Sequence, residues 1–415
     1  MKFIVEGGRP LAGRIRVSGS KNAVLPMLAA TLLTRHRCVI TDVPDIVDVR
    51  NFLKILTDLG CSVKTRPGKV EVAAENLRTF RPDPVLVGSM RASVVLLGAL
   101  LGRSRQVDLS FPGGDLIGAR PIDVHLRAFS QMGAVANGQS RLRLKAKRLN
   151  GAEVFAESSV TGTENMILAG VLATGTTVIK LAALEPHVLS LCKFLKKMGA
   201  RISGIGTHTL VIRGVKNLHG ATSSVIPDMI EAGTFALLAA ATKSQITITN
   251  VDHSQMDAVY HKMSEMGVRF SLAKDSLTIL KPKSSYRAGA IRTGLYPNLA
   301  TDLQPPFGVF ATQCRGTSVV HDWIWEGRLG YLAELKKLGA RVRLIDTHRA
   351  EITGPVGLKS GNIRSSDIRA GMTLLIAAIV ARGKSVVRDI HHIDRGYEKI
   401  EQRLSKLGAK ITRQV

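Results

Sequence analysis

The chain has 415 residues and a mass of 44.7 kDa, which exceeds one ordinary domain and predicts two or more. Apolar residues make up 45% of the chain and charged residues 22%, and the longest uncharged stretches, such as residues 165–179, are too short for a membrane helix. This composition excludes a disordered chain and argues against a membrane span. With 58 lysines and arginines against 32 acidic residues, the net charge of +26 predicts attraction to polyanions, either nucleic acid or phosphorylated small molecules.

The N-terminal segment and the cysteines indicate a cytoplasmic protein without disulfides. Residues 1–8 contain charged residues and two glycines where a secretory signal needs an unbroken apolar core. The cysteines show no CxxC or Cys/His spacing, so we expect reduced, mostly buried thiols and no metal site at Cys38, Cys61, Cys192 and Cys314.

The predicted elements repeat six times along the chain. Each repeat has an Ala- and Leu-rich helix that runs into a β-branched strand, as in residues 236–241 before 246–248. A second helix with a charged face follows, and it ends at a glycine that can adopt the left-handed conformation. These glycines lie 73, 66, 68, 72 and 69 residues apart, at Gly60, Gly133, Gly199, Gly267, Gly339 and Gly408. We expect the Ala-rich helices, apolar on all sides, to be buried with the sheets outside them.

One strongly basic run lies in the second repeat. Residues 141–148 alternate basic and apolar side chains, which predicts one basic strand face that carries Arg141, Arg143, Lys145 and Lys147. We interpret this as a solvated strand face rather than a dedicated groove. No aromatic residue interleaves with the run, which argues against binding of single-stranded nucleic acid there.

Charged and polar residues stand where the six Ala-rich helices are predicted to begin, at Lys21-Asn22, Arg91, Thr163-Glu164, Asp228, Asp302 and Arg369. An aspartate at such a place acts as an N-cap, but the helix dipole disfavours Lys21, Arg91 and Arg369. Helix N-termini also bind phosphate and carboxylate groups. Three cations at these positions predict an anion held between them, and pairing with nearby carboxylates is the alternative.

The segment 111–125 is the most specific in the sequence. Three glycines within six residues, Gly113, Gly114 and Gly118, predict a mobile loop that folds over a ligand. Arg120-Pro121 is then expected to start a helix, with the guanidinium placed to bind a phosphate in a bidentate way.

Taken together, these features resemble the enolpyruvyl transferases. The resemblance covers nearly the whole chain and rests on the six repeats, the loop around Asp115, the pair Thr301-Asp302 and the segment 392–398. It implies an α/β fold of two domains, each an inside-out α/β barrel of three βαβαββ-like repeats. Residues 20–226 would form the first domain and carry the lid loop 111–120, and residues 1–19 plus 227–415 would form the second, with the active site between them.

The resemblance implies transfer of the enolpyruvyl group from phosphoenolpyruvate to the 3-hydroxyl of UDP-N-acetylglucosamine with release of phosphate, an early step of peptidoglycan synthesis. No cofactor is implied, and His391-His392 lacks partners at a metal-ligand spacing. The implied phosphoenolpyruvate ligands are Lys21, Asn22, Arg120, Arg328, Arg369 and Arg395. The implied UDP-N-acetylglucosamine ligands are Asn22, Arg91, Arg120, Pro121, Ile122, Asp123, Val124, His125, Ser159, Val160, Thr161, Asp302 and Ile324.

The resemblance also implies four catalytic residues, Asp115, Asp302, Lys21 and Arg395. Asp115, where many members have Cys, would protonate C3 of phosphoenolpyruvate, and Asp302 would assist attack by the sugar hydroxyl. Aspartic acid is ordinarily ionised near pH 7, so we expect lid closure and the substrate's negative charges to keep the acid protonated. Because fosfomycin alkylates the lid cysteine in this family, the chain is expected to be insensitive to it.

Simpler interpretations stay open for three of these residues: a surface-loop carboxylate for Asp115, a helix cap for Asp302 and an ordinary core residue for Ile324. Two other functions also stay open. One is the sister reaction that makes 5-enolpyruvylshikimate 3-phosphate, although the lid and the segment 394–398 favour the nucleotide sugar. The other is a non-catalytic paralogue that binds RNA through its basic surface.

Overall fold

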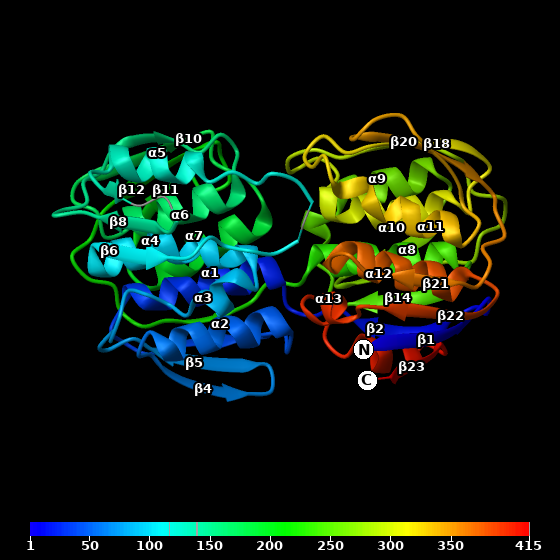
Figure 1. Cartoon of the computed structure of the whole chain (residues 1–415), viewed down its shortest axis with the longest axis horizontal. Coiled ribbons are helices and arrows are strands. Elements are labelled where there is room, and N and C mark those ends of the chain that lie inside the picture. Colours follow the sequence, from blue (N-terminus) through cyan, green and yellow to red (C-terminus); the bar gives the residue numbers. More distant parts are fainter. Residues whose placement is uncertain (116, 138–139, 415) are drawn as a thin grey trace. The chain divides into compact units, whose positions relative to one another are not determined.

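The computed structural model describes residues 1–115, 117–137 and 140–414, which form an α/β fold (Figure 1). By its internal contacts the chain divides into two compact units. Unit 1 comprises Met1–Ser18, Asp115–Ala119 and Pro227–Val415, and unit 2 comprises Gly19–Gly114 and Arg120–Ile226. The segment Asp115–Ala119 thus groups with unit 1, whereas the chain on either side of it groups with unit 2.

Unit 2 contains the first three repeats. The first has α1 (Lys21–Ala30), η1 (Thr31–Leu33), β3 (Cys38–Thr41), α2 (Val47–Asp58), β4 (Ser62–Arg66) and β5 (Lys69–Ala73). The second has α3 (Pro84–Gly88), η2 (Arg91–Val95), α4 (Leu96–Ser104), β6 (Gln106–Leu109), α5 (Asp123–Gln131), β7 (Val135–Asn137) and β8 (Leu142–Lys145). The third has β9 (Glu153–Phe155), α6 (Val160–Gly170), β10 (Thr176–Lys180), α7 (Pro186–Lys197), β11 (Arg201–Ser203), β12 (Thr209–Arg213) and β13 (Thr222–Ser224).

Unit 1 contains β1 (Lys2–Gly7), β2 (Ala12–Arg16) and the last three repeats. The fourth has α8 (Met229–Ala241), β14 (Gln245–Thr249), η3 (His253–Gln255), α9 (Asp257–Glu265), β15 (Phe270–Ala273) and β16 (Ser276–Ile279). The fifth has β17 (Ala290–Arg292), η4 (Thr301–Leu303), α10 (Gln304–Ala311), β18 (Gly316–His321), η5 (Arg328–Gly330), α11 (Tyr331–Lys337), β19 (Arg341–Leu344) and β20 (Arg349–Gly354). The sixth has β21 (Asn362–Arg364), α12 (Ile368–Val380), β22 (Gly383–Arg388), α13 (His391–Asp394), α14 (Ile400–Ser405) and β23 (Lys410–Gln414).

The five four-stranded sheets share one strand order and exchange strands along the chain, and in the described residues the second repeat has the three-stranded sheet β6-β8-β7. In the third repeat the order is β9-β10-β12-β11, with β9 parallel to β10 and the other pairs antiparallel. The first repeat takes its outer parallel strand from β13, and the fourth takes it from β2. Strand β1 completes the sixth sheet between β22 and β23. Among the described residues every sheet is open and none closes into a barrel.

The glycines that mark the repeats end helices as predicted. Gly60, Gly133, Gly199, Gly267, Gly339 and Gly408 have φ values between 87° and 101°. A side chain with a Cβ is strained in this left-handed conformation, so glycine is the favoured residue at each of the six helix ends. The six-fold repeat read from the sequence is therefore present in the backbone.

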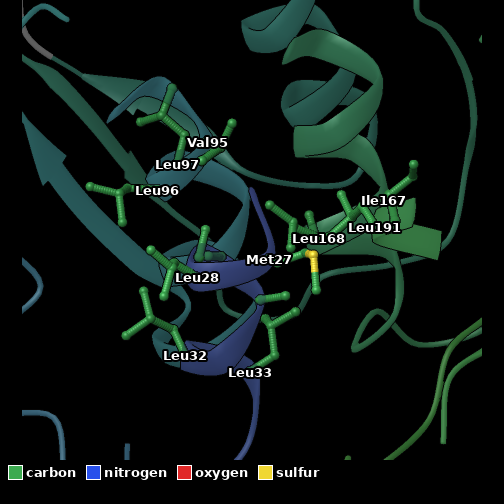
Figure 2. Close-up of a cluster of buried hydrophobic side chains, with 14 of the residues drawn as sticks. Met27, Leu28, Leu32, Leu33, Val95, Leu96, Leu97, Ile167, Leu168 and Leu191 are labelled. Carbon is green, nitrogen blue, oxygen red and sulfur yellow. The ribbon is translucent and has the colours of Figure 1, made fainter. Parts of the chain in front are cut away.

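The Ala-rich helices are buried, as expected. In unit 1 every residue of α8 after Met229 is buried, and Figure 1 shows α8, α10 and α12 with β18 and β20 on one side and β1, β2 and β22 on the other. In unit 2 the core joins α1, η1, η2, α4, α6 and α7 (Figure 2). The labelled side chains are Met27, Leu28, Leu32, Leu33, Val95, Leu96, Leu97, Ile167, Leu168 and Leu191. Full burial of one such leucine contributes about 2 kcal/mol.

Three details of the sequence analysis need correction. The third buried helix starts at Val160 and not at Thr163-Glu164, because Ser159 caps it. The helix expected at Arg120-Pro121 starts at Asp123, because Arg120 has a left-handed backbone with φ of 48°. The basic run forms only the short strand β8, so Arg141 and Lys147 lie outside the strand.

Two other expectations were tested directly. The four cysteines are free and buried, as predicted. In the part of the chain that the structure describes, no helix has both the length and the apolar character needed to span a bilayer.

Candidate active site

Asp302 is the centre of a charge network in unit 1. It lies in η4, just before the buried helix α10. Its Oδ1 accepts a hydrogen bond from Arg328 Nη2 at 2.8 Å, and its Oδ2 accepts one from Arg369 Nε at 2.9 Å. The side chains of Arg328 and Arg369 are 2% and 5% exposed, and that of Asp302 is 24% exposed. One partly accessible carboxylate is therefore shared by two buried arginines.

Arg369 stays charged in spite of its burial. It lies in the first turn of α12, whose N-cap is Asp367. Burial opposes its charge, but the neighbouring Asp302 carboxylate, Tyr397 and Asp228 raise the pKa of Arg369 above its ordinary value. Its Nη1 also donates to the Tyr397 hydroxyl at 3.2 Å. The guanidinium is thus fixed as a cation near the start of a helix, where the helix dipole alone would disfavour it.

Asp322 connects this network to Ile324, and the sequence analysis did not identify it. Asp322 is fully buried, and its Oδ2 accepts from Thr301 Oγ1 at 2.7 Å. Thr301 Oγ1 in turn accepts from Arg328 Nε at 3.2 Å. The other oxygen of Asp322 accepts from the amide of Ile324 at 3.0 Å. An aspartate directly after a strand is a sequence signal for such a turn.

Asp115 forms an ion pair with Arg395. Asp115 Oδ1 lies 2.6 Å from Arg395 Nη1, and the two side chains are 14% and 13% exposed. Arg395 directly follows α13 in the sixth repeat. The structure thus places the predicted acid and a predicted phosphate ligand in direct contact within unit 1.

Glu326 holds the chain just after Asp115. Its Oε1 accepts from the amide of Ala119 at 2.8 Å, and the amide of Gly327 donates to the carbonyl of Ile117 at 3.0 Å. Hydrogen bonds from its own amide and that of Ala119 lower the pKa of Glu326. A Cβ at Gly118 would lie 2.5 Å from Glu326 Oε2, so a side chain there would displace the Glu326 carboxylate. The sequence analysis missed this role of Glu326.

In unit 2, Lys21 is paired with a carboxylate. It is the first residue of α1, and its Nζ lies 2.8 Å from Asp48 Oδ2 in the first turn of α2. The two side chains are 12% and 2% exposed. The alternative interpretation, that the unexpected cations pair with nearby carboxylates, therefore describes Lys21 and also Arg369. Asn22 follows in the same turn and is partly buried.

Arg91 is held by backbone carbonyls instead. It opens η2, and its Nη2 donates to the carbonyls of Arg120 and Pro121, the latter at 3.2 Å. Partial burial lowers the pKa of Arg91. These contacts bring together three residues that the sequence assigns to the nucleotide sugar.

His125 is a buried, neutral histidine. The residue is only 1% exposed. Its Nδ1 accepts a hydrogen bond from Asn165 Nδ2 at 2.8 Å, and its Nε2 lies 3.4 Å from Thr161 Oγ1. Burial, followed by the charge of Arg91, lowers the pKa of His125 to about 4. The ring therefore joins α5 to the start of α6, where Ser159 caps the helix by accepting from the amide of Gly162 at 3.2 Å.

The remaining predicted residues are exposed or partly buried. In unit 2, Pro121 and Asp123 are exposed, while the partly buried members are Asn22, Arg120, Ile122, Val124, Ser159, Val160 and Thr161. In unit 1, Ile324 is partly buried. No group of three or more His, Cys, Asp or Glu side chains within the described ranges is placed to hold a metal ion.

Comparison with known proteins relates the whole chain to enzymes. The family described as EPSP synthase (3-phosphoshikimate 1-carboxyvinyltransferase) matches residues 5–404. UDP-N-acetylglucosamine 1-carboxyvinyltransferase 1 of Caldanaerobacter subterraneus is 40% identical over 414 residues, which cover 99% of each chain. The UDP-N-acetylglucosamine 1-carboxyvinyltransferase of Helicobacter pylori is 41% identical over 420 residues, covering 100% of this chain and 99% of the relative.

Solved structures give the same relationship. The enolpyruvyl transferase NikO from Streptomyces tendae superposes with a TM-score of 0.91 at 25% identity, covering 99% of this chain and 98% of NikO. EPSP synthase from Acinetobacter baumannii gives a TM-score of 0.78 at 16% identity over the full length of both chains, which establishes the fold alone. The chain thus belongs to the enolpyruvyl transferase family, with the UDP-N-acetylglucosamine 1-carboxyvinyltransferases as full-length relatives at about 40% identity.

Proposed function

We propose that this chain transfers the enolpyruvyl group of phosphoenolpyruvate to the 3-hydroxyl of UDP-N-acetylglucosamine and releases phosphate. The observation that carries the proposal is the placement of Asp302 between Arg328 and Arg369, together with the pair Asp115–Arg395 in the same unit. A carboxylate surrounded by cations suits a reaction in which a hydroxyl loses a proton next to a phosphorylated acid. The identity of 40% to enzymes named for this acceptor, against 16% for EPSP synthase, favours UDP-N-acetylglucosamine over shikimate 3-phosphate.

The proposal includes the finer features that the family resemblance implies. Residues 20–226 and residues 1–19 plus 227–415 would each form an inside-out barrel, and residues of both would bind the substrates. The reaction would take place in the cytoplasm as part of peptidoglycan precursor synthesis, and it needs no cofactor.

Binding of phosphoenolpyruvate would replace contacts that two arginines make within the protein. Arg395 contacts Asp115, and Arg369 contacts Asp302. When the phosphate and carboxylate of phosphoenolpyruvate take hydrogen bonds from these arginines, each aspartate loses part of its cationic partner. For Asp115 this change produces the acid that C3 needs, and for Asp302 it produces a base for the sugar hydroxyl.

The chemistry then balances in two steps. In the first, the 3-hydroxyl oxygen bonds to C2 of phosphoenolpyruvate while Asp302 takes the hydroxyl proton and Asp115 gives a proton to C3. In the second, the Asp115 carboxylate takes a proton back from C3, and the electrons of that C–H bond form the double bond to C2 again. The bond from C2 to the phosphate oxygen breaks with its electron pair leaving on the phosphate, which takes the proton held by Asp302. Lys21, Arg120 and Arg395 would hold the phosphate and stabilise its departure.

Phosphate release from phosphoenolpyruvate tests the proposal in three parallel reactions. We expect release with UDP-N-acetylglucosamine and none with shikimate 3-phosphate or without an acceptor. Release with shikimate 3-phosphate alone would assign the sister reaction. Tight, salt-sensitive RNA binding without any turnover would assign the binding module instead.

Fosfomycin tests the part played by Asp115. The four cysteines are at most 5% exposed, and burial raises the pKa of Cys61, Cys192 and Cys314 to about 12. A reactive thiolate is therefore missing from these positions, and a carboxylate attacks an epoxide poorly. We propose that the protein is insensitive, and that Asp115→Cys remains active and becomes inactivated with time. Covalent labelling of the unmodified protein at Asp115 would contradict this.

A further inference from the structure

A cationic cavity lies in unit 2, and none of the residues assigned above lines it. It has a volume of about 230 Å³ and is lined by Arg37, Lys64, Arg66, Lys69 and Glu71. These residues come from β4, β5 and the residue just before β3, in the sheet with order β13-β3-β5-β4. Four cations therefore share one small space with a single carboxylate.

The register of the sheet explains why these side chains meet. Lys64 on β4 is opposite Glu71 on β5, and Arg66 is opposite Lys69. Side chains two residues apart on a strand point to the same face, so all four lie together. Val70 and Val72, which alternate with them, are 3% and 1% exposed on the core side. The cavity is thus on the solvent face of a sheet whose other face is fixed by the core.

The charges in the cavity are not balanced by the protein. Glu71 Oε1 lies 2.9 Å from Lys69 Nζ, and its Oε2 lies 3.2 Å from Arg37 Nη1. The lysine's hydrogen bond contributes most to lowering the pKa of Glu71, so the carboxylate is ionised. Among the described residues, no carboxylate lies within ion-pair distance of Lys64 or Arg66. Four cations against one carboxylate leave a net charge of +3.

The equivalent sheet of the fifth repeat shows that the repeat does not require this excess. There Arg343 on β19 is opposite Glu351 on β20, as Lys64 is opposite Glu71. Arg343 Nη2 and Glu351 Oε1 form an ion pair of 2.8 Å. Arg66 is opposite a second cation, Lys69, whereas the equivalent positions of the fifth repeat hold the neutral Ile345 and Arg349. Arg349 is paired with Asp346 at 2.7 Å.

We propose that this face of unit 2 binds a compact oligophosphate, a chain of two or three linked phosphates that is free or carried by a nucleotide. Guanidinium groups bind phosphate oxygens in a bidentate way, and lysines add point charges. The cavity exceeds the roughly 30 Å³ of one water several times. It is smaller than the roughly 300–1,000 Å³ of pockets that enclose whole organic ligands. This size selects the phosphate groups and leaves any nucleoside outside.

Because the cations of the cavity are partly exposed, salt weakens their attraction to a ligand, and a ligand with several charges is needed for binding. Physiological salt screens single charges at a protein surface over about 8 Å. A tripolyphosphate contacts several cations at once, so its binding withstands this screening better than that of inorganic phosphate. We therefore expect tripolyphosphate to bind more tightly than inorganic phosphate.

Calorimetric titration of the full chain with tripolyphosphate at about 0.15 M salt tests the inference. We expect the double variant Lys64→Ala/Arg66→Ala to bind tripolyphosphate about tenfold more weakly or worse, because each substitution removes a cation that donates hydrogen bonds to phosphate oxygens. The matched control Arg341→Ala/Arg343→Ala removes the same charge from the equivalent strand and should change affinity less than about twofold. Equal losses in both double variants, or no loss in either, would overturn the proposal.

Two further variants make the test independent of folding defects and of the active site. Glu71→Gln removes the single negative charge and should tighten tripolyphosphate binding, and weaker binding would overturn the proposal. Arg395→Ala should leave this affinity unchanged, because Arg395 does not line the cavity. Loss of binding in Arg395→Ala would place the probe at the proposed active site and overturn the inference. Equal affinity for ATP and tripolyphosphate would show that the cavity recognises the phosphates alone. Tighter binding of ATP would show that its ligand is a nucleotide.

Discussion

The two units hold their predicted site cations in different ways. In unit 1, Arg328 and Arg369 both contact Asp302, and the two arginine side chains are at most 5% exposed. In unit 2, Lys21 contacts Asp48, while Arg91 contacts the carbonyls of Arg120 and Pro121. In unit 1 two arginines thus share one carboxylate, in addition to the pair Asp115–Arg395, whereas in unit 2 Lys21 and Arg91 contact different partners.

This difference has an energetic consequence. In a shared network, removal of one member leaves buried charges without a partner, and the effects of substitutions do not add. Separate pairs can be changed one at a time, and their effects add. We therefore expect substitutions around Asp302 to be larger and more strongly coupled than those around Lys21.

Asp302→Asn gives the largest expected effect. The amide keeps the shape and can still accept a hydrogen bond, but it cannot take a proton, so turnover should fall about 1,000-fold. The Michaelis constant for UDP-N-acetylglucosamine should change much less. Steady-state kinetics with a thermal unfolding check measure both. Asp367→Asn is the matched control, because Asp367 lies 4.0 Å from Arg328 Nη1 and caps α12. Weaker binding at unchanged turnover would make Asp302 a positioning residue only.

Lys21→Ala is expected to reduce turnover about 100-fold, because it removes a cation that would stabilise the departing phosphate. Asp48→Asn is the informative partner, since it removes the carboxylate and keeps the cation. If unit 2 holds its cations separately, Asp48→Asn should retain most of the turnover. A loss as large as that of Lys21→Ala would mean that the pair acts as a network, and the contrast between the units would fail.

The sequence predicted the helices and turns of both units better than it predicted the contacts of the site cations. The six helix-ending glycines and the buried helices follow from local periodicity, so they were correctly predicted. The contact between Arg369 and Asp302 joins residues 67 positions apart, and only the fold brings them together. The same holds for Asp48, which has no local signal that relates it to Lys21.

Local rules failed where backbone conformation overrode residue preference. Proline commonly occupies the first turn of a helix, which favoured a helix start at Arg120-Pro121. The residue before a proline is itself disfavoured in the helical region. Here Arg120 has φ of 48°, and the helix begins at Asp123, whose carboxylate suits a helix N-terminus.

Substitution of His125 tests whether burial of a neutral side chain, rather than a charge network, stabilises the predicted site of unit 2. Its folded-state pKa of about 4 lies below the ordinary value of about 6.5. The stability that depends on the neutral ring is therefore fully present above about pH 6.5 and is lost as the pH falls toward 4. As the pH falls through this range, the free energy of unfolding should decrease in the parent more steeply than in His125→Gln. The difference between the two slopes should be about 1 kcal/mol per pH unit.

Chemical denaturation at a series of pH values measures this difference. Thr161→Val removes a partner of the ring but keeps the imidazole, so it should retain the pH dependence of the parent. Parallel curves for the parent and His125→Gln would show that His125 does not titrate differently in the folded and unfolded states.

Glu326 gives the smallest expected effect, and it tests whether the segment Asp115–Ala119 positions Asp115 against Arg395. Glu326→Ala removes the acceptor for the amide of Ala119, while Glu326→Gln keeps an acceptor and removes the charge. Because Glu326 is exposed, salt screens its charge, and Glu326→Ala should lower turnover only about threefold. Glu326→Gln should lie between Glu326→Ala and the parent. If the segment positions Asp115 against Arg395, then combining Glu326→Ala with Asp115→Ala should add nothing to the loss in Asp115→Ala alone. A further threefold loss in the double variant would show that Glu326 acts independently of Asp115, so the segment would not position Asp115 against Arg395.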